Sequence, residues 1–161
     1  MKYKTRIYTD TGSFVTVEID SNFKFEKNLA MWEVVNKSAS DAIKMAIYPE
    51  TWITYKVFQR YRELKNQPVK IKGNYRTKSF NNKVGGNANS AHLRGDALDT
   101  IDPGLTLNQH KINATLWQKA CKEFNVIGAI GFYDWGNHLE CFTDMFYGAK
   151  TFQIWDERTI K

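Results

Sequence analysis

Cysteine and proline are scarce in this chain, which has two and three of them in 161 residues. Cys121 and Cys141 are too few for a framework of disulfide bonds, and they form no Cys-x-x-Cys unit. We expect both to be buried free thiols, although a single disulfide bond between them stays open. A small domain held together by several disulfide bonds is therefore excluded.

Long apolar runs are also missing from the sequence. No run approaches the roughly 18 apolar residues that a membrane-spanning helix needs. The N-terminal residues 1–6 are basic, but no apolar segment follows them. We therefore expect no Sec signal peptide and no membrane partner.

Acidic residues are outnumbered by basic ones. The 23 lysines and arginines and 17 aspartates and glutamates give a formal net charge of +6. A basic surface favours anionic partners in general, such as nucleic acid or an anionic cell wall. The basic residues are spread along the chain, whereas a nucleic-acid-binding protein would gather them on one face. We therefore expect no nucleic acid partner.

The pattern of apolar residues predicts an α+β fold, with helices packed on a small, largely antiparallel sheet. Two β-rich runs at residues 3–9 and 14–19 flank an Asp/Gly turn and predict an N-terminal hairpin. Residues 28–46 look helical but interrupted, with a Ser-Ala-Ser-Asp cap at 38–41 where the helix would restart.

Two longer helices are predicted. The first begins at Pro49, a good residue for a first turn, and is stopped by Pro68. Its apolar stripe comprises Ile53, Val57, Tyr61 and Leu64. The second covers residues 108–124, with Ile112, Leu116, Trp117, Ala120 and Phe124 facing inward.

Short strands complete the expected sheet. Residues 69–72 alternate as a half-buried strand does, and two further strands are expected near 127–133 and 138–143. The turn at 134–137 joins these two. By contrast, residues 77–105 contain few apolar side chains and many Gly, Asn and Ser. A polar stretch of this length in a compact domain is usually functional or disordered.

This polar stretch contains His92 and Asp99. Zinc binds imidazole nitrogen and carboxylate oxygen, and a catalytic zinc site uses three protein ligands. Gly95 would permit a tight backbone path between the two residues. A third ligand must come from elsewhere. His138, which follows a turn and begins an expected strand, is a better candidate than His110, for which we expect a solvated surface role. On composition alone, surface loop residues remain the simpler interpretation.

Four motifs occur in order along the chain. They are Gly73-Asn74-Tyr75-Arg76-Thr77, Asn82-Lys83-Val84-Gly85-Gly86, Ser90-x-His92-x-x-Gly95-x-Ala97-x-Asp99, and His138-Leu139-Glu140. With these motifs the chain resembles the zinc D-Ala-D-Ala carboxypeptidases and L-Ala-D-Glu endopeptidases, which occur in bacteria and as phage endolysins. The resemblance covers roughly residues 45–142.

The resemblance implies a role for each matching residue. His92, Asp99 and His138 match the zinc ligands of the family. Arg76 matches an arginine that steadies charge on the substrate carbonyl. Ser90 matches a serine that lies beside the metal and helps to position substrate.

The catalytic acid departs from the family pattern. Many members place it three residues before the second metal-binding histidine, where this chain has Trp135. We expect Asp134, in the turn, to reach the metal as general base. Glu140 is the alternative, or supports His138 from the same strand face. Tyr133 is expected in the wall of the cleft.

The resemblance implies a zinc peptidase that hydrolyses amide bonds in the peptide stems of peptidoglycan. One domain would span residues 1–161, with a hairpin extension at 1–22, a catalytic core at 23–145 and a tail at 146–161. We expect a monomer that is cytoplasmic until released by a phage, or virion-associated. The alternative is a non-catalytic zinc-containing binding module, similar to the hedgehog signalling domain. Which peptide bond is cut stays open.

Overall fold

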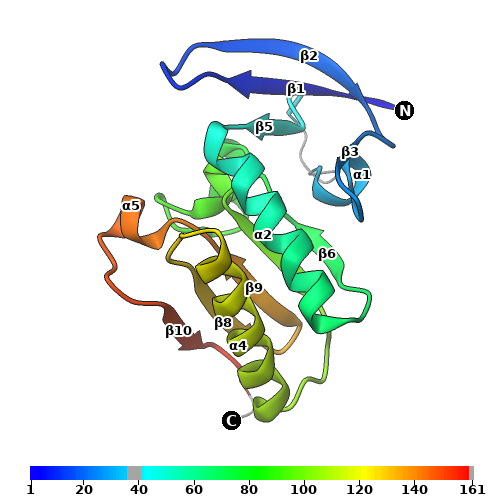
Figure 1. Cartoon of the computed structure of the whole chain (residues 1–161). Coiled ribbons are helices and arrows are strands. Elements are labelled where there is room, and N and C mark those ends of the chain that lie inside the picture. Colours follow the sequence, from blue (N-terminus) through cyan, green and yellow to red (C-terminus); the bar gives the residue numbers. More distant parts are fainter. Residues whose placement is uncertain (36–40, 160–161) are drawn as a thin grey trace.

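The computed structural model describes residues 1–35 and 41–159 and has the predicted α+β architecture (Figure 1). Its central sheet has five strands in the order β10-β8-β9-β7-β6. These strands are β6 (Lys70–Gly73), β7 (Ala97–Ile101), β8 (Ala129–Tyr133), β9 (Gly136–Glu140) and β10 (Gln153–Asp156). The sheet is antiparallel except at its edge, where β10 runs parallel to β8. No strand was predicted at the position of β10 (Gln153–Asp156).

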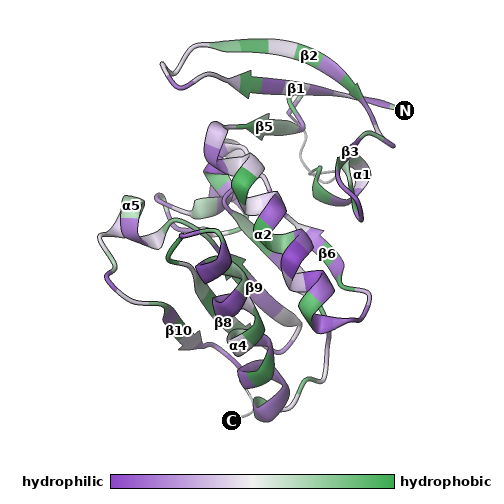
Figure 2. Cartoon of the chain, viewed as in Figure 1, coloured by the Kyte–Doolittle hydropathy of each residue, from purple (hydrophilic) through white to green (hydrophobic). Residues whose placement is uncertain are grey.

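Two long helices, α2 (Pro49–Lys65) and α4 (Leu107–Glu123), lie side by side against the central sheet (Figure 1). Tyr61 of α2 and Trp117 of α4 meet edge to face in the core, with ring centroids 5.7 Å apart. Apolar and polar residues alternate around both helices, as expected for helices with one buried side (Figure 2).

Two predicted inward-facing residues point outward instead. Ile53 is 37% exposed and Ile112 is 50% exposed. In α2 the buried stripe passes through Tyr55, which lies about 200° around the helix from Ile53. In α4 the inward position next to Ile112 belongs to Asn113, whose amide hydrogen-bonds within the core.

The N-terminal hairpin is confirmed: β1 (Lys2–Tyr8) and β2 (Phe14–Asp20) pair antiparallel. A third strand, β5 (Met45–Ile47), runs parallel to β1 on its other side. This hairpin stands apart from the two long helices in Figure 1.

The interrupted helix expected at 28–46 is wrong. This region contains β4 (Leu29–Ala30), which pairs with β3 (Lys24–Glu26), and the single-turn helix α1 (Met31–Val34). Its last residues form β5, whose three apolar residues are all buried. Continuous burial of this kind suits a covered strand better than an amphipathic helix. The restart cap at 38–41 falls mostly outside the described residues.

The polar stretch between β6 and β7 is ordered. It contains α3 (Lys78–Lys83), capped by Thr77, and the short 3-10 helix η1 (Ala91–Arg94). Gly95 ends η1 with a positive φ of 73°, a conformation that glycine adopts without strain. After β9 comes α5 (Thr143–Tyr147).

The two cysteines are buried free thiols, as predicted. None of the described helices is both long and apolar enough to cross a membrane.

Candidate metal centre

Pairing of β7 with β9 brings two of the predicted ligands together. Asp99 lies directly opposite His138 in this antiparallel pair, so their side chains project from the same face of the sheet. His92 reaches the same place from η1. Potential ligand atoms of the three residues all lie within 4.8 Å of one another, close enough to hold one metal ion.

One oxygen of Asp99 is the centre of this cluster. Its Oδ1 atom lies 3.2 Å from Nε2 of His92 and 3.0 Å from Nδ1 of His138. The two imidazole rings are nearly perpendicular, with centroids 4.9 Å apart. Two ring nitrogens and one carboxylate oxygen therefore converge on one point, which is the donor set of a three-ligand zinc site.

The hydrogen bonds on the far sides of the rings fit metal binding. Nδ1 of His92 lies 2.5 Å from the backbone oxygen of Asn74, which can only accept, so Nδ1 carries the proton. Nε2 of His138 lies 3.2 Å from Oε2 of Glu140 and donates to it in the same way. Each ring therefore turns its other nitrogen toward Asp99, and that nitrogen can bind a metal ion once it carries no proton, as metal-binding histidines require.

Asn74 is a supporting residue that the sequence analysis missed, although it lies in the first motif. Its side chain is fully buried and donates to the backbone oxygens of Gly95 and Ala97, while Oδ1 accepts from Tyr55. Asn74 therefore joins β6 to the segment that carries His92. The signal in the sequence was its position between Gly73 and Tyr75, two residues before Arg76 in the same motif.

Charge at the cluster is balanced by Arg76. Its Nη2 donates to Oδ2 of Asp99 over 2.5 Å. Burial alone would raise the pKa of Asp99, but the adjacent His92 and His138 hold that pKa well below its usual range. Asp99 is therefore a carboxylate at neutral pH.

The two histidines differ in their affinity for protons. Burial lowers the pKa of His92. Burial acts on His138 in the same direction, but its hydrogen bonds to Asp99 and Glu140 outweigh it and raise the pKa to about 9. A metal ion that binds here must therefore displace a proton from His138.

A cleft of about 650 Å³ opens onto the cluster. It is lined by four of the predicted residues, Arg76, Ser90, Tyr133 and Glu140. Ser90 also caps η1, because its Oγ accepts from the backbone N–H of His92. The expected neighbours of the metal cluster are therefore present in the cleft.

Asp134 is placed differently from our expectation. Among the described residues, the cleft lining includes Tyr133 and Trp135 but not Asp134. Its carboxylate instead accepts hydrogen bonds from the backbone and hydroxyl groups of Thr159. Tyr133 and Trp135 stack with ring centroids 4.7 Å apart, so the turn directs these two aromatic side chains to the cleft. Glu140 and Asp99 are the carboxylates that line it.

Trp155 of β10 is a second residue that the sequence analysis missed. Its ring lies 5.5 Å from that of His138, and its Nε1 donates to the hydroxyl of Tyr133 over 3.0 Å. A Cβ atom on Gly131 would lie 2.5 Å from this ring, so glycine in β8 allows Trp155 to approach. The residues around position 155 carry no motif that could have revealed this role.

His110 is buried, whereas we expected it on a solvated surface. It is 1% exposed, stacks on Phe132, and its Nδ1 accepts from the amide of Asn137 over 2.7 Å. The polar residues at the start of α4 gave no indication that His110 lies on the inner side of the helix. It does not belong to the metal cluster.

A scan against protein-family models matches residues 23–141 to the peptidase M15 family. The match covers more than half of the chain. The chain belongs to the peptidase M15 family. Searches of curated proteins and of solved structures found no match.

Members of this family are zinc-dependent peptidases, and the His92, Asp99 and His138 cluster of this M15 domain can hold a metal ion. The matched region contains the whole cluster and Glu140. It leaves out the N-terminal hairpin and Trp155.

Proposed function

We propose that this M15 domain is a zinc peptidase that hydrolyses amide bonds in the peptide stems of peptidoglycan. The observation that carries the proposal is the convergence of one nitrogen from each imidazole ring on Asp99, while the other nitrogen of each ring donates to an acceptor on the far side. The net charge of +6 is consistent with an anionic cell wall as partner. We further propose that it acts as a monomer, without nucleic acid, in wall lysis by a phage.

In this proposal His92, Asp99 and His138 hold the ion. Zinc at such a site polarises a carbonyl and lowers the pKa of water, which prepares both partners for amide hydrolysis. Asn74 and Glu140 orient the two imidazole rings. Supporting residues of this kind typically change metal affinity or activity by about 10–100-fold.

Arg76 stabilises negative charge on the substrate. Its Nη2 is held by Asp99, and a guanidinium group has five N–H donors, so others can face the cleft. A donor aimed at a developing oxyanion contributes roughly 2.7–4 kcal/mol in comparable sites. The Asp99 contact fixes the group before substrate arrives.

Glu140 replaces Asp134 as the proposed general base. It lies in the cleft beside His138, whereas Asp134 is bonded to Thr159 in the turn. A carboxylate has two oxygens, so Oε1 can take a proton from water and pass it to the leaving amine while Oε2 remains with His138. Tyr133 and Ser90, which both line the cleft, would position the substrate.

The decisive experiment incubates the zinc-loaded protein with purified peptidoglycan and identifies the products by mass spectrometry. We expect new amine and carboxyl ends in the peptide stems, loss of activity with a chelator, and recovery on adding zinc. A protein that binds one zinc ion yet releases no product from any stem would overturn the proposal. That result would favour the zinc-containing binding module instead.

A further inference from the structure

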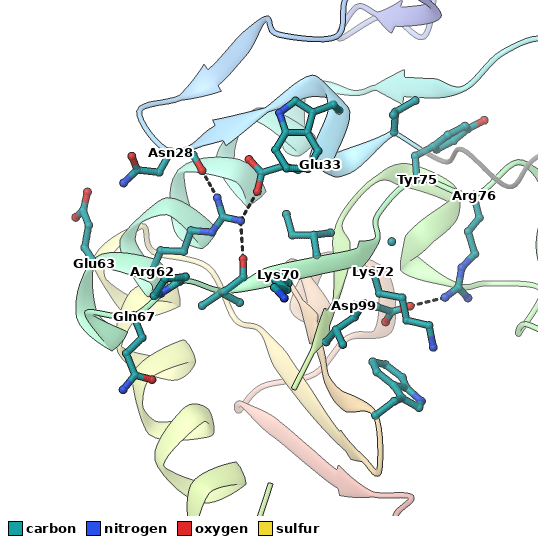
Figure 3. A pocket seen from close by; sticks show the side chains of 18 of the residues that line it. Asn28, Glu33, Arg62, Glu63, Gln67, Lys70, Lys72, Tyr75, Arg76 and Asp99 are labelled. Atoms are coloured by element: carbon teal, nitrogen blue, oxygen red, sulfur yellow. Dashed lines mark hydrogen bonds and ion pairs between the residues drawn. The ribbon is translucent and has the colours of Figure 1, made fainter. Parts of the chain in front are cut away.

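A long groove continues from the metal cleft along the edge of the central sheet (Figure 3). Its volume is about 1420 Å³, and it shares Arg76, Asp99 and Trp135 with the metal cleft. From there it follows β6 to Gln67, with Glu33 of α1 on the opposite wall (Figure 3). β6 is the last strand of its sheet, so one of its backbone edges faces away from β7.

The dimensions of the groove suit an extended peptide. Gly73 lies opposite Asp99 in the sheet, and Lys70 lies opposite Ile101 at the far end of β6. An extended chain rises about 3.3 Å per residue, so this stretch of β6 accommodates roughly three to four residues. An exposed strand edge is a surface to which such a chain can add.

Most charges in the groove already have partners. Arg62 donates to Glu33 over 2.6 Å and to the backbone oxygen of Val69 over 2.7 Å. Glu63 pairs with Arg60. Some of these contacts are drawn in Figure 3. They occupy the charged groups at that end of the groove, which are therefore less available to bind a ligand.

Lys70 and Lys72 are the exception. Both are exposed on β6, and no carboxylate of the described residues forms an ion pair with either. The ammonium group of Lys72 lies 4.4 Å from the ring centroid of Trp135, at the junction of the groove and the cleft. The groove therefore offers two uncompensated cations in line with the metal cluster.

We propose that this groove binds an extended, carboxylate-bearing peptide on one side of the scissile bond, so that the domain is an endopeptidase. The inference rests on the proposed function. It adds that the groove along β6 holds the peptide on one side of the scissile bond. A carboxypeptidase needs room on one side for a single terminal residue, whereas this site is open both at the cleft and along β6. Lys70 and Lys72 are specificity residues for the carboxylate, and the chemistry remains with the metal cluster.

The test uses a synthetic stem peptide that is acetylated at its N-terminus, amidated at its C-terminus, and carries a free glutamate carboxylate. A second peptide has that carboxylate amidated as well. The variant Lys70→Gln/Lys72→Gln is compared with Lys119→Gln, which removes an exposed charge from α4. Hydrolysis is followed by mass spectrometry, and peptide binding to zinc-loaded Glu140→Gln is followed by calorimetry with and without the lysine changes.

We expect cleavage of the doubly blocked peptide at an internal bond. The double variant should raise KM for the free-carboxylate peptide about 3–10-fold, as expected for loss of two exposed charge contacts, and leave kcat within about twofold. It should leave KM for the amidated peptide unchanged, and Lys119→Gln should change neither value.

Two results would overturn the inference while leaving the proposed function intact. One is hydrolysis that requires a free C-terminus, and the other is unchanged KM in the double variant for both peptides. The reverse case is also distinguishable: if no peptide is hydrolysed but binding to the Glu140→Gln protein depends on Lys70 and Lys72, the groove stands and the peptidase proposal fails.

Discussion

Strand β9 presents neighbouring residues to two very different faces of the central sheet. His138 points to the open face, where its partners are the carboxylates of Asp99 and Glu140. Asn137 points to the face covered by α4, where its amide donates to His110 and accepts from Asn113. Each face has a buried histidine, but the direct partners are carboxylates on the open face and neutral amides on the covered one.

The difference shows which histidines are placed to bind a metal ion. His110 is as deeply buried as His92, yet its partner is a neutral amide, and burial lowers its pKa. His92 and His138 instead share one carboxylate oxygen, and each is bonded through its other nitrogen to an acceptor. Burial alone therefore does not distinguish the two kinds of site, whereas the charge and direction of the hydrogen bonds do.

The largest expected effect comes from removing a histidine on the open face. His92→Ala or His138→Ala should abolish both zinc uptake and hydrolysis, because two protein ligands are too few for such a site. The parent should bind one zinc ion per chain. Elemental analysis of the purified proteins and a peptidoglycan assay measure the two quantities.

His110→Ala provides the matched control on the covered face. It should retain zinc, at the cost of some stability from the unpaired amide of Asn137. Loss of zinc from this variant alone would show that the third ligand is His110, and the comparison of the two faces would fail.

The next largest effect distinguishes Glu140 from Asp134 as the general base. Glu140→Gln should retain zinc but lose roughly 10²–10⁴-fold in kcat, the usual contribution of general acid–base catalysis. Asp134→Asn should keep kcat within about twofold, because that carboxylate is bonded to Thr159 in the turn. Single-turnover rates of zinc-loaded proteins test this, and an inactive Asp134→Asn with an active Glu140→Gln would return the role to Asp134.

The metal cluster could be predicted because its residues match motifs of a known family, whereas their spacing alone left surface loop residues as the simpler interpretation. His92 and Asp99 share one motif, and the antiparallel pairing that puts Asp99 opposite His138 follows from two short strands. Asp134 was misplaced because sequence distance to His138 does not say which side of a turn a residue faces. Its neighbours Tyr133 and Trp135 occupy the side that opens to the cleft.

Other features depend on tertiary contacts that local patterns do not encode. Trp155 reaches the cleft only because β10 adds to the sheet beside β8, where Gly131 leaves space for its ring. Met45–Ile47 had the composition of a helix or a strand, and pairing with β1 decides between them. The inward position of His110 likewise depends on Asn137, which lies 27 residues further along the chain.

A smaller effect follows from the proton on His138. Its pKa of about 9 lies above the unfolded value of about 6.5, so the proton stabilises the metal-free fold fully below pH 6.5. That stability is lost as the pH rises through 9. Zinc must displace this proton, so its apparent affinity should rise about tenfold per pH unit between roughly 7 and 9.

Competition with a chelator at several pH values measures this slope. Glu140→Gln removes one of the two hydrogen bonds that raise the pKa of His138, so the slope should end at a lower pH. If the zinc affinity does not change between roughly pH 7 and 9, His138 carries no extra proton in the metal-free protein. That result would contradict the positive charge that we assign to His138.

The smallest effect on activity is expected from Asn137, although it precedes His138 directly. Asn137→Ala leaves the acceptor on His110 and the donor on Asn113 without their partner, and an unsatisfied buried polar group costs about 1–3 kcal/mol. The free energy of unfolding of the zinc-free protein in urea should therefore fall by roughly 2–4 kcal/mol. Zinc affinity and kcat should stay within about twofold, because alternate residues of a strand face opposite sides of the sheet. Thr115→Ala, on the exposed side of α4, is the control and should change none of these quantities. If zinc affinity drops tenfold or more in folded Asn137→Ala, the covered face helps to set the geometry of the open one, and the two faces cannot be treated as independent.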